Sequence, residues 1–421
     1  MNLKIKVPSL IWWILGIVSV GGLIISNFSL PNYTYYAADA LNIIIFIYAV
    51  RKVRCLKHIK GISIIGGLLF IFVIDTLIGV VGNHVPMGLT IWGTRNIYRY
   101  ILFMFSCLVF LSEKDINSFL KLLPKVYSAN FILVLFQFFF QGKRGDFLGG
   151  IFGIAQGCNG ATTIFLNIFI AIEIAMYLYN KISFGKIAIY SIVYLIIAAL
   201  SETKGNFLFF VVIVIIALMI SKKSFKTIGY GITALLAIAI GINILNIYFP
   251  GSADFLFDFD KANSYMDAKY FGTVTFTRNA VLQVANEYFF KDSTWLYLFG
   301  YGLGACDMSS FFVSPFFLRY GYMNYRQYSS AMTVLQLGYI GLIVYIAFFV
   351  VVAVAAIRNT ANDNDVEYKF LNVAVACIAI FAIADSFYAS LYIDMGYWIF
   401  FVMAIPWILR KSNRKREVMQ V

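Results

Sequence analysis

The chain has 421 residues, of which 61% are hydrophobic and 13% are charged, and its mean hydropathy is +0.83. A soluble globular protein is typically about 45–50% apolar and about 25% charged, so this composition excludes an ordinary soluble domain and indicates an α-helical membrane protein. The net charge of +13 does not indicate nucleic-acid binding, because excess lysine and arginine in such a protein normally mark cytoplasmic loops.

Apolar runs bounded by charges, proline or glycine predict about twelve membrane spans. In chain order they cover 10–26, 36–50, 62–82, 98–112, 126–141, 160–179, 187–200, 206–220, 228–249, 331–357, 369–387 and 395–409. The expected fold class is therefore all-α and polytopic. The predicted regions are 1–249 with the first spans, a long and partly helical external loop at 250–330, and 331–421 with the last spans and a basic tail.

The distribution of basic residues predicts the orientation of the chain. An even number of spans places both termini on one side, and cytoplasmic termini put most lysines and arginines of the short loops inside. The long loop is exempt, because long loops cross the membrane regardless of charge. We therefore expect a protein of the cytoplasmic (inner) membrane with cytoplasmic termini and an outward-facing loop. The basic residues of short loops that violate this pattern are Arg95, Arg99, Lys143, Arg144 and Lys204.

These exceptions are candidate ligands for an anion outside the membrane. Arg95 and Arg99 are four residues apart, which places them on one face of a helix. Lys204 lies in the expected hairpin 201–205, where an interfacial lysine that extends to the surface is an equally good interpretation. For the adjacent pair after the fifth span, an ordinary solvated loop is the better interpretation.

The loop carries further cations and a glycine-rich turn. Arg278 begins the segment 277–290, which we expect to be an amphipathic helix. The sequence 300–304 reads Gly-Tyr-Gly-Leu-Gly, and the backbone amides of Gly302 and Gly304 are candidates for contacts to a phosphate. This motif alone is weak evidence, and its context does not predict a nucleotide site. The face expected to be apolar comprises Val281, Val284, Ala285 and Tyr288, and the later cations are Arg319 and Arg326.

Other polar residues suggest less. The aspartates at the start of the loop lack the spacing of a calcium site, so we expect neither a metal nor a cofactor. Asp75 and Glu173 lie inside expected spans, where helix–helix hydrogen bonding is a better interpretation than a proton relay. Cys158 and Cys306 both fall on the expected outer side, so a disulfide between them is one option.

Arginine suits a diphosphate, because its planar guanidinium binds two oxygens at once and stays charged at every relevant pH. Preorganised cations can also stabilise a departing diphosphate without a metal ion. Aromatic side chains around such cations suit sugar rings. The external cations therefore favour a site for anionic, sugar-bearing lipids.

The arrangement resembles the O-antigen polymerase/ligase family, the Wzy-like polymerases. Beside the expected topology, four local patterns carry the resemblance: the hairpin 201–205, with lysine as the cation; Arg278 before a helix; Phe-Gly-Tyr-Gly-Leu-Gly at 299–304; and Leu-Gln-Leu-Gly-Tyr-Ile-Gly-Leu at 335–342. The resemblance implies a metal-independent glycosyltransferase that polymerises polyprenyl-diphosphate-linked oligosaccharides into O-antigen or capsular polysaccharide. It also implies the lipid bilayer, and in some cases a chain-length regulator, as partners.

On this reading Arg278 and Lys204 bind the diphosphate, with Arg95, Arg99 and Arg319 as supporting cations. Arg326 and Tyr328 are further candidates for substrate binding. Ligases of the family carry a His-Asn pair where this chain has Gln327 and Tyr328, which favours a polymerase and leaves the general base unassigned. His58 is expected to be cytoplasmic and His84 is distant in sequence. The candidates for the base are Glu202, Glu287 and Asp307.

Three alternatives stay open. A ligase of the same fold would use the same cations. A flippase or transporter of lipid-linked oligosaccharides would also hold a diphosphate, but in a cavity near the bilayer midplane between related halves. A structural or regulatory membrane protein is the third alternative.

Overall fold

The computed structural model describes residues 7–56, 59, 61–221, 224–267, 274–309, 311–362, 368–390 and 395–420; His58 lies outside them. In this part of the chain regular structure is helical apart from one isolated bridge between Met308 and Val313. The helices are α1 (Val7–Phe28), α2 (Tyr36–Val50), α3 (Ile62–Gly82), α4 (Met87–Phe110), α5 (Glu113–Phe139), α6 (Cys158–Leu178), α7 (Phe184–Leu200), α8 (Gly205–Ser221), α9 (Ser224–Tyr248), α10 (Phe259–Met266), α11 (Val281–Val284), α12 (Thr294–Phe299), α13 (Pro315–Tyr320), α14 (Ser329–Asn362), α15 (Lys369–Tyr388) and α17 (Gly396–Gln420).

Every expected span coincides with one of these helices. Eight helical segments in the described residues are long and apolar enough to cross a membrane, and α7 and α8 are shorter apolar helices. The chain is therefore an all-helical, multi-pass membrane protein by length and composition, while the number of about twelve spans stays a prediction. α4 begins at Met87 and not near residue 98, so both of its arginines lie within the helix.

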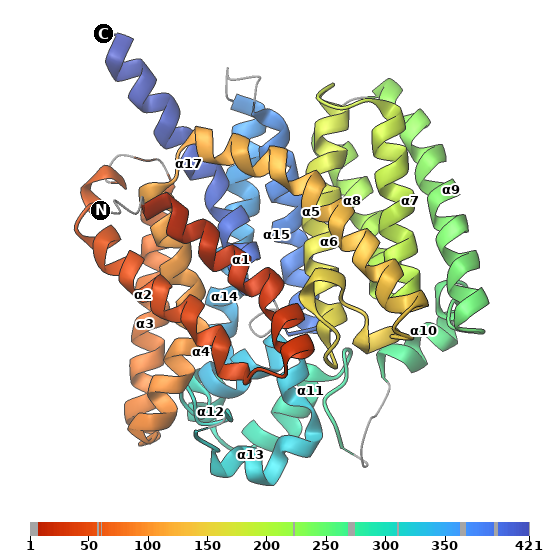
Figure 1. The fold of residues 1–421 in the computed structure, drawn as a ribbon. Coiled ribbons are helices and arrows are strands. Elements are labelled where there is room, and N and C mark those ends of the chain that lie inside the picture. Colours follow the sequence, from red (N-terminus) through yellow and green to blue (C-terminus); the bar gives the residue numbers. More distant parts are fainter. Residues whose placement is uncertain are drawn as a thin grey trace.

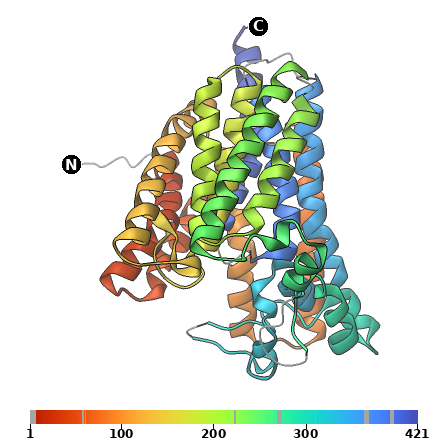
Figure 2. The same ribbon diagram turned by 90° about the vertical axis from the view of Figure 1, so that its right-hand side faces the viewer.

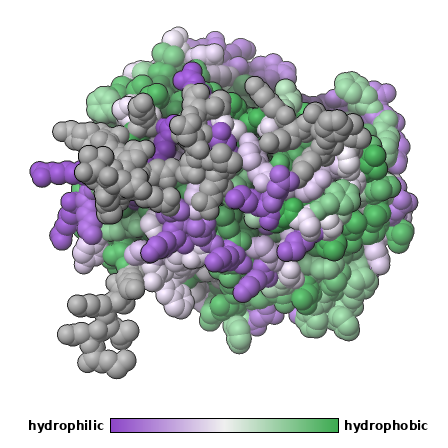
Figure 3. Space-filling view, turned by 90° about the horizontal axis from the view of Figure 1, so that it is seen from above, coloured by the Kyte–Doolittle hydropathy of each residue, from purple (hydrophilic) through white to green (hydrophobic). Residues whose placement is uncertain are grey.

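The long helices form one bundle, and α10 to α13 gather at the end opposite the C-terminal end of α17 (Figures 1 and 2). Figure 3 views the molecule from the C-terminal end, where hydrophilic residues cross the face and hydrophobic residues cover its right-hand edge. This distribution fits a bundle whose C-terminal end is polar and whose sides face lipid.

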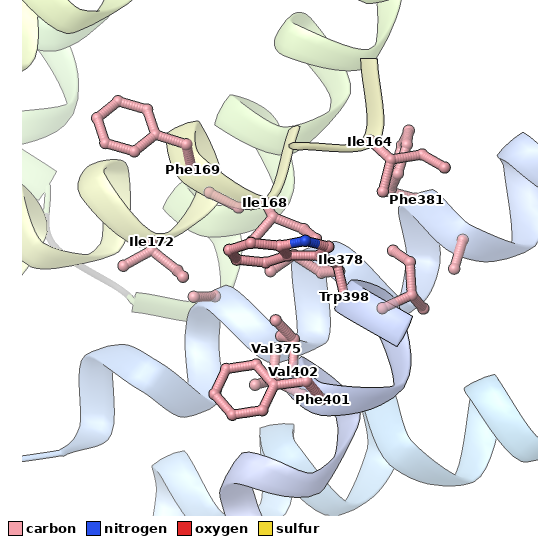
Figure 4. Packing of buried hydrophobic residues seen from close by; sticks show 14 of the residues in the cluster. Ile164, Ile168, Phe169, Ile172, Val375, Ile378, Phe381, Trp398, Phe401 and Val402 are labelled. Atoms are coloured by element: carbon pink, nitrogen blue, oxygen red, sulfur yellow. The ribbon is translucent and has the colours of Figure 1, made fainter. Parts of the chain in front are cut away.

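The centre of the bundle packs around Trp398 of α17. Its ring lies among side chains of α6 and α15, including Ile168 and Ile378 (Figure 4). The indole N–H donates to the Ser19 hydroxyl of α1 over 2.9 Å, so the polar edge of this buried ring has a partner. Between membrane helices such close van der Waals packing replaces much of the hydrophobic driving force.

The loop is joined to the bundle through a break in α14. Gly338 has φ +62° and ψ −164°, which interrupts the helix, and a Cβ there would lie 2.2 Å from the Leu298 carbonyl oxygen. The glycine-rich turn enters this break: the Tyr301 N–H donates to the Leu335 carbonyl over 2.8 Å, and the Gly302 N–H to the Gln336 carbonyl over 3.0 Å. Glycine is needed at 302 and 338 because φ is positive at both and another segment's backbone lies within 3 Å of where a Cβ would be.

A second core lies under the loop, and it corrects one expectation. The segment 285–290 is a π-helix that follows α11, so the expected amphipathic helix widens partway along. Val284 and Ala285 are buried as expected, but Tyr288 is 56% exposed and Phe289 is buried. The wider turn of a π-helix shifts which positions face inward, so the period of an α-helix placed Tyr288 on the wrong face.

Candidate functional site

Two groups of cations lie near the loop end of the bundle. The first, here called the Arg278 cluster, comprises Arg278, Lys204, Glu202, Tyr265 and Tyr388. The Arg278 guanidinium carbon lies 4.6 Å from the ring centres of both Tyr265 and Tyr388, and the Lys204 ammonium lies 5.4 Å from the Tyr265 ring centre. The two cations expected to bind a diphosphate therefore share an aromatic neighbour, although 74 residues separate them in the sequence.

The tyrosines fix Arg278 in place. Their hydroxyl groups are 2.7 Å apart in a hydrogen bond, and the Arg278 side chain donates to the Tyr265 carbonyl over 3.3 Å. Tyr265 comes from α10 and Tyr388 from the end of α15, so the arginine stacks between the loop and the bundle. Such cation–π contacts contribute about 0.5–1 kcal/mol each when exposed and about 2 kcal/mol when desolvated.

The hairpin between α7 and α8 supplies the other half of the cluster. The Lys204 ammonium is 3.4 Å from the Glu202 carboxylate, which also accepts from the Ser252 hydroxyl over 3.3 Å. Glu202 has φ +53°, a backbone conformation that is costly for a residue with a side chain and is found disproportionately at functional sites. A Cβ on Gly205 would lie 2.7 Å from the Tyr388 ring, so glycine there allows the hairpin to approach the tyrosine.

The second group, here called the arginine cavity, is a cavity of about 130 Å³. Arg95 and Arg99 of α4 line it together with Arg326 and Asp307 of the loop. Both α4 arginines are paired with the buried Asp39 of α2: the Arg95 Nε donates to it over 2.8 Å, and an Arg99 nitrogen lies 3.5 Å away. The expected pairing of the α4 arginines on one helix face is thus realised in space.

Asp307 is the loop carboxylate of this cavity. Its side chain is 2% exposed, lies 3.4 Å from the Arg326 Nε and accepts from the Asn96 amide. Burial raises the pKa of Asp307 above its ordinary value, although the nearby Arg326 opposes this shift. Three guanidinium groups and the carboxyl groups of Asp307 and Asp39, the latter paired with the α4 arginines, leave the cavity with at least one excess positive charge.

The two groups meet at the end of α15. Tyr388 stacks on Arg278, and Ser390, two residues further on, lines the arginine cavity. The Ala389 carbonyl between them accepts from the Ser329 N–H over 3.0 Å, which ties this end to the start of α14.

Several predicted site residues lie elsewhere. Arg319 is exposed on α13, with its guanidinium carbon 5.2 Å from the Tyr320 ring centre. Glu287 is exposed and accepts from Gln283 of its own helical segment over 3.0 Å, and no described contact joins it to either group. Tyr328 is buried at the start of α14 and does not line the arginine cavity.

The glycine turn requires a correction. The Gly302 N–H donates to the Gln336 carbonyl, and the Gly304 N–H donates to the Gln336 side-chain oxygen over 2.6 Å. Both amides are therefore occupied inside the protein and do not face a phosphate. A Cβ on Gly304 would lie 1.9 Å from the Leu89 carbonyl oxygen, so close packing against α4 explains this glycine.

One option and one expectation are not realised. Cys158 and Cys306 are both free thiols, so the disulfide does not form. Asp75 is buried in α3, but neither of its carboxylate oxygens has a hydrogen-bond partner among the described residues, so it does not bond a neighbouring helix. Glu173 is buried within α6. Among the described residues no group of three or more His, Cys, Asp or Glu could hold a metal ion.

Sequence reasoning missed the partners of the cations. Tyr265 and Tyr388 gave no signal, because tyrosine is abundant throughout the chain, with 28 copies. Asp39 did give one: it is an acidic residue inside an expected span, where charged side chains are rare and are usually paired. Searching for an opposite charge at a similar depth would have led to the arginines of α4.

Comparison of the sequence with models of known protein families and with curated proteins found no match.

Proposed function

We propose that the protein polymerises polyprenyl-diphosphate-linked oligosaccharide repeats on the outer face of a cytoplasmic membrane. The observation that carries the proposal is the Arg278 cluster, in which Arg278, Lys204 and a carboxylate meet from distant parts of the chain. The two cations bind the donor diphosphate, and the two tyrosine rings hold Arg278 in position for it.

In this reaction a hydroxyl oxygen of the acceptor repeat attacks the anomeric carbon of the donor glycan. The bond from that carbon to the diphosphate oxygen breaks, and polyprenyl diphosphate leaves with the electron pair. Arg278 and Lys204 stabilise the charge that develops on the leaving group, a role in which fixed cations are effective. The acceptor hydroxyl proton passes to a carboxylate.

Glu202 is the base that the geometry favours. It is the carboxylate of the Arg278 cluster, 3.4 Å from Lys204 and 34% exposed on its side chain, so a hydroxyl can reach it. Glu287 lies outside both groups, and Asp307 is nearly inaccessible and engaged in the arginine cavity. A base must come within about 3 Å of the proton it accepts.

The test is the banding pattern of surface glycan in cells that lack the protein and carry variants. Arg278→Ala is expected to leave single repeats, and Glu202→Gln to reduce polymer by about 10²–10⁴-fold in rate, as loss of a general base does. Arg319→Ala, an exposed arginine of the same loop, is the matched control and should retain full-length polymer.

The other outcomes decide against the proposal. Full-length polymer that accumulates on the lipid carrier, unattached to its final acceptor, identifies a ligase. Repeats trapped on the cytoplasmic side identify a transporter, and the catalytic roles given to Arg278 and Glu202 then fall.

A further inference from the structure

A large apolar cavity lies directly beside the arginine cavity. It has a volume of about 550 Å³ and is lined mainly by α3, α4 and α14, with further residues from the segment 53–59, including Arg54, and Phe400 of α17. Its lining includes Leu68 and Phe72 of α3, Ile101 and Met104 of α4, and Val344 of α14. Pockets of about 300–1,000 Å³ are typical of sites for small molecules, so this cavity is large enough for a ligand.

The two cavities have one lining residue in common. Ile97 of α4, 6% exposed, lines both of them, and it lies between the two arginines of the same helix in sequence. From Ile97 to Leu108, the last α4 residue on the apolar lining, a helix rises about 16 Å. The apolar cavity therefore continues from the arginine cavity along α4.

The arginine cavity suits an anion. It has at least one excess positive charge, and Trp92, which also lines it, has a buried indole N–H without a hydrogen-bond partner among the described residues. An indole N–H can only donate, so an anionic oxygen would satisfy it. The volume of about 130 Å³ corresponds to about four water molecules, which is enough for a phosphate group.

We infer that the arginine cavity and the apolar cavity form one binding site for a single-chain lipid phosphate, with the phosphate among the arginines and the chain along α4. Its position beside the Arg278 cluster makes it a second lipid site. If the proposed function holds, the site binds the carrier lipid of the second substrate, so that both lipid-linked glycans are held at once. A single chain is favoured because the apolar cavity extends from the polar one along one face of α4.

Two adjacent glycines provide a matched test. Gly66 of α3 lines the apolar cavity and Gly67 does not, and an added Cβ meets no atom within 4 Å at either position. Phenylalanine at 66 therefore projects into the cavity, whereas at 67 it projects elsewhere on the same helix. Both changes replace a helical glycine, so their effect on helix formation is the same.

The experiment measures binding of polyprenyl diphosphate to the purified full chain by native mass spectrometry. An Arg278→Ala background removes the first site. Gly66→Phe is expected to weaken binding at least tenfold and Gly67→Phe to leave it unchanged. Arg326→Gln should also weaken binding, and Arg319→Gln should not.

Equal binding to Gly66→Phe and Gly67→Phe would overturn the inference, because the chain would then not occupy the apolar cavity. Phosphatidylglycerol that competes as well as polyprenyl diphosphate would assign the site to a two-chain bilayer lipid and would also overturn it. Inorganic diphosphate that binds as tightly as the lipid would remove the role of the chain. None of these measurements requires turnover, so failure of this inference is distinguishable from failure of the proposed function.

Discussion

Replacing Asp39 with asparagine tests whether the arginine cavity is held by charge. Asp39 is 7% exposed and is the shared partner of Arg95 and Arg99, and the Tyr397 hydroxyl donates to it over 2.6 Å. Asparagine keeps the shape and can still accept from Tyr397. Its amide nitrogen, however, replaces the second accepting oxygen, so the substitution removes the negative charge and one hydrogen-bond acceptor for the arginines.

The expected cost is large. Breaking a buried ion pair by removing one partner typically destabilises a protein by about 3–5 kcal/mol. The arginine side chains are 22% and 15% exposed, so water compensates part of this loss and we expect about 2–4 kcal/mol. The same change raises the excess positive charge of the cavity by one, because it removes one carboxylate. Lipid phosphates should consequently bind more tightly to a less stable protein.

The assay is unfolding by sodium dodecyl sulfate in mixed micelles, with and without polyprenyl diphosphate. Asp254→Asn is the matched control, because Asp254 pairs with Lys261 at the exposed surface and its loss should leave the free energy of unfolding unchanged. If Asp39→Asn is as stable as that control, charge pairing does not organise the cavity. If its stability falls while lipid binding weakens, the cavity is not an anion site.

Four further outcomes are expected. Because burial raises the pKa of Asp307, the folded protein binds the Asp307 proton more tightly than the unfolded chain does. The free energy of unfolding should therefore fall as the pH rises from the ordinary carboxyl range through the raised pKa. Asp307→Asn should remove this dependence when unfolding is measured at a series of pH values. Lipid phosphate should bind the arginine cavity less well over the same rise in pH, which titrations of native protein and Asp307→Asn would reveal. Gly304→Ala should destabilise the chain by at least about 1–3 kcal/mol in the same micelle assay, because its Cβ would overlap the Leu89 carbonyl. A variant as stable as the native chain would show that the turn is not packed against α4. Tyr388→Phe should retain most polymer because the ring under Arg278 remains, and Tyr388→Leu should lose it; equal glycan banding from the two would exclude a role for the ring.

The helices could be predicted from the sequence because apolar runs of sufficient length have few alternatives. The start of α4 was placed about eleven residues too late, since Arg95 and Arg99 made its first turns look like a loop. Pairing with Asp39, together with the aromatic rings beside the two guanidinium groups, explains why these charges are tolerated there. Local sequence does not reveal that Arg95 pairs with Asp39, because the two residues are 56 positions apart in the chain.

The candidate site was predictable in part. Arg278 and Lys204 were singled out by their charge and do lie together, because charge is visible residue by residue. The prediction that Gly302 and Gly304 contact a phosphate is wrong. A glycine-rich turn with positive φ occurs both in packed turns and in anion sites, and only the contacts to Gln336 show that this turn is a packed one. The exposed position of Glu287 agrees with its interpretation as an exposed helical carboxylate, whereas the exposure of Tyr288 depends on the register of a π-helix, which an α-helical period does not predict.

The junction between the glycine turn and the break at Gly338 consists of backbone hydrogen bonds, and few side chains contribute to it. The loop can therefore exchange much of its surface sequence without losing its attachment to the bundle. A chimera that keeps residues 298–304 and 335–338 but carries a foreign loop surface should still fold onto the membrane domain. Loop surfaces of different sequence can in this way be carried by the same backbone junction.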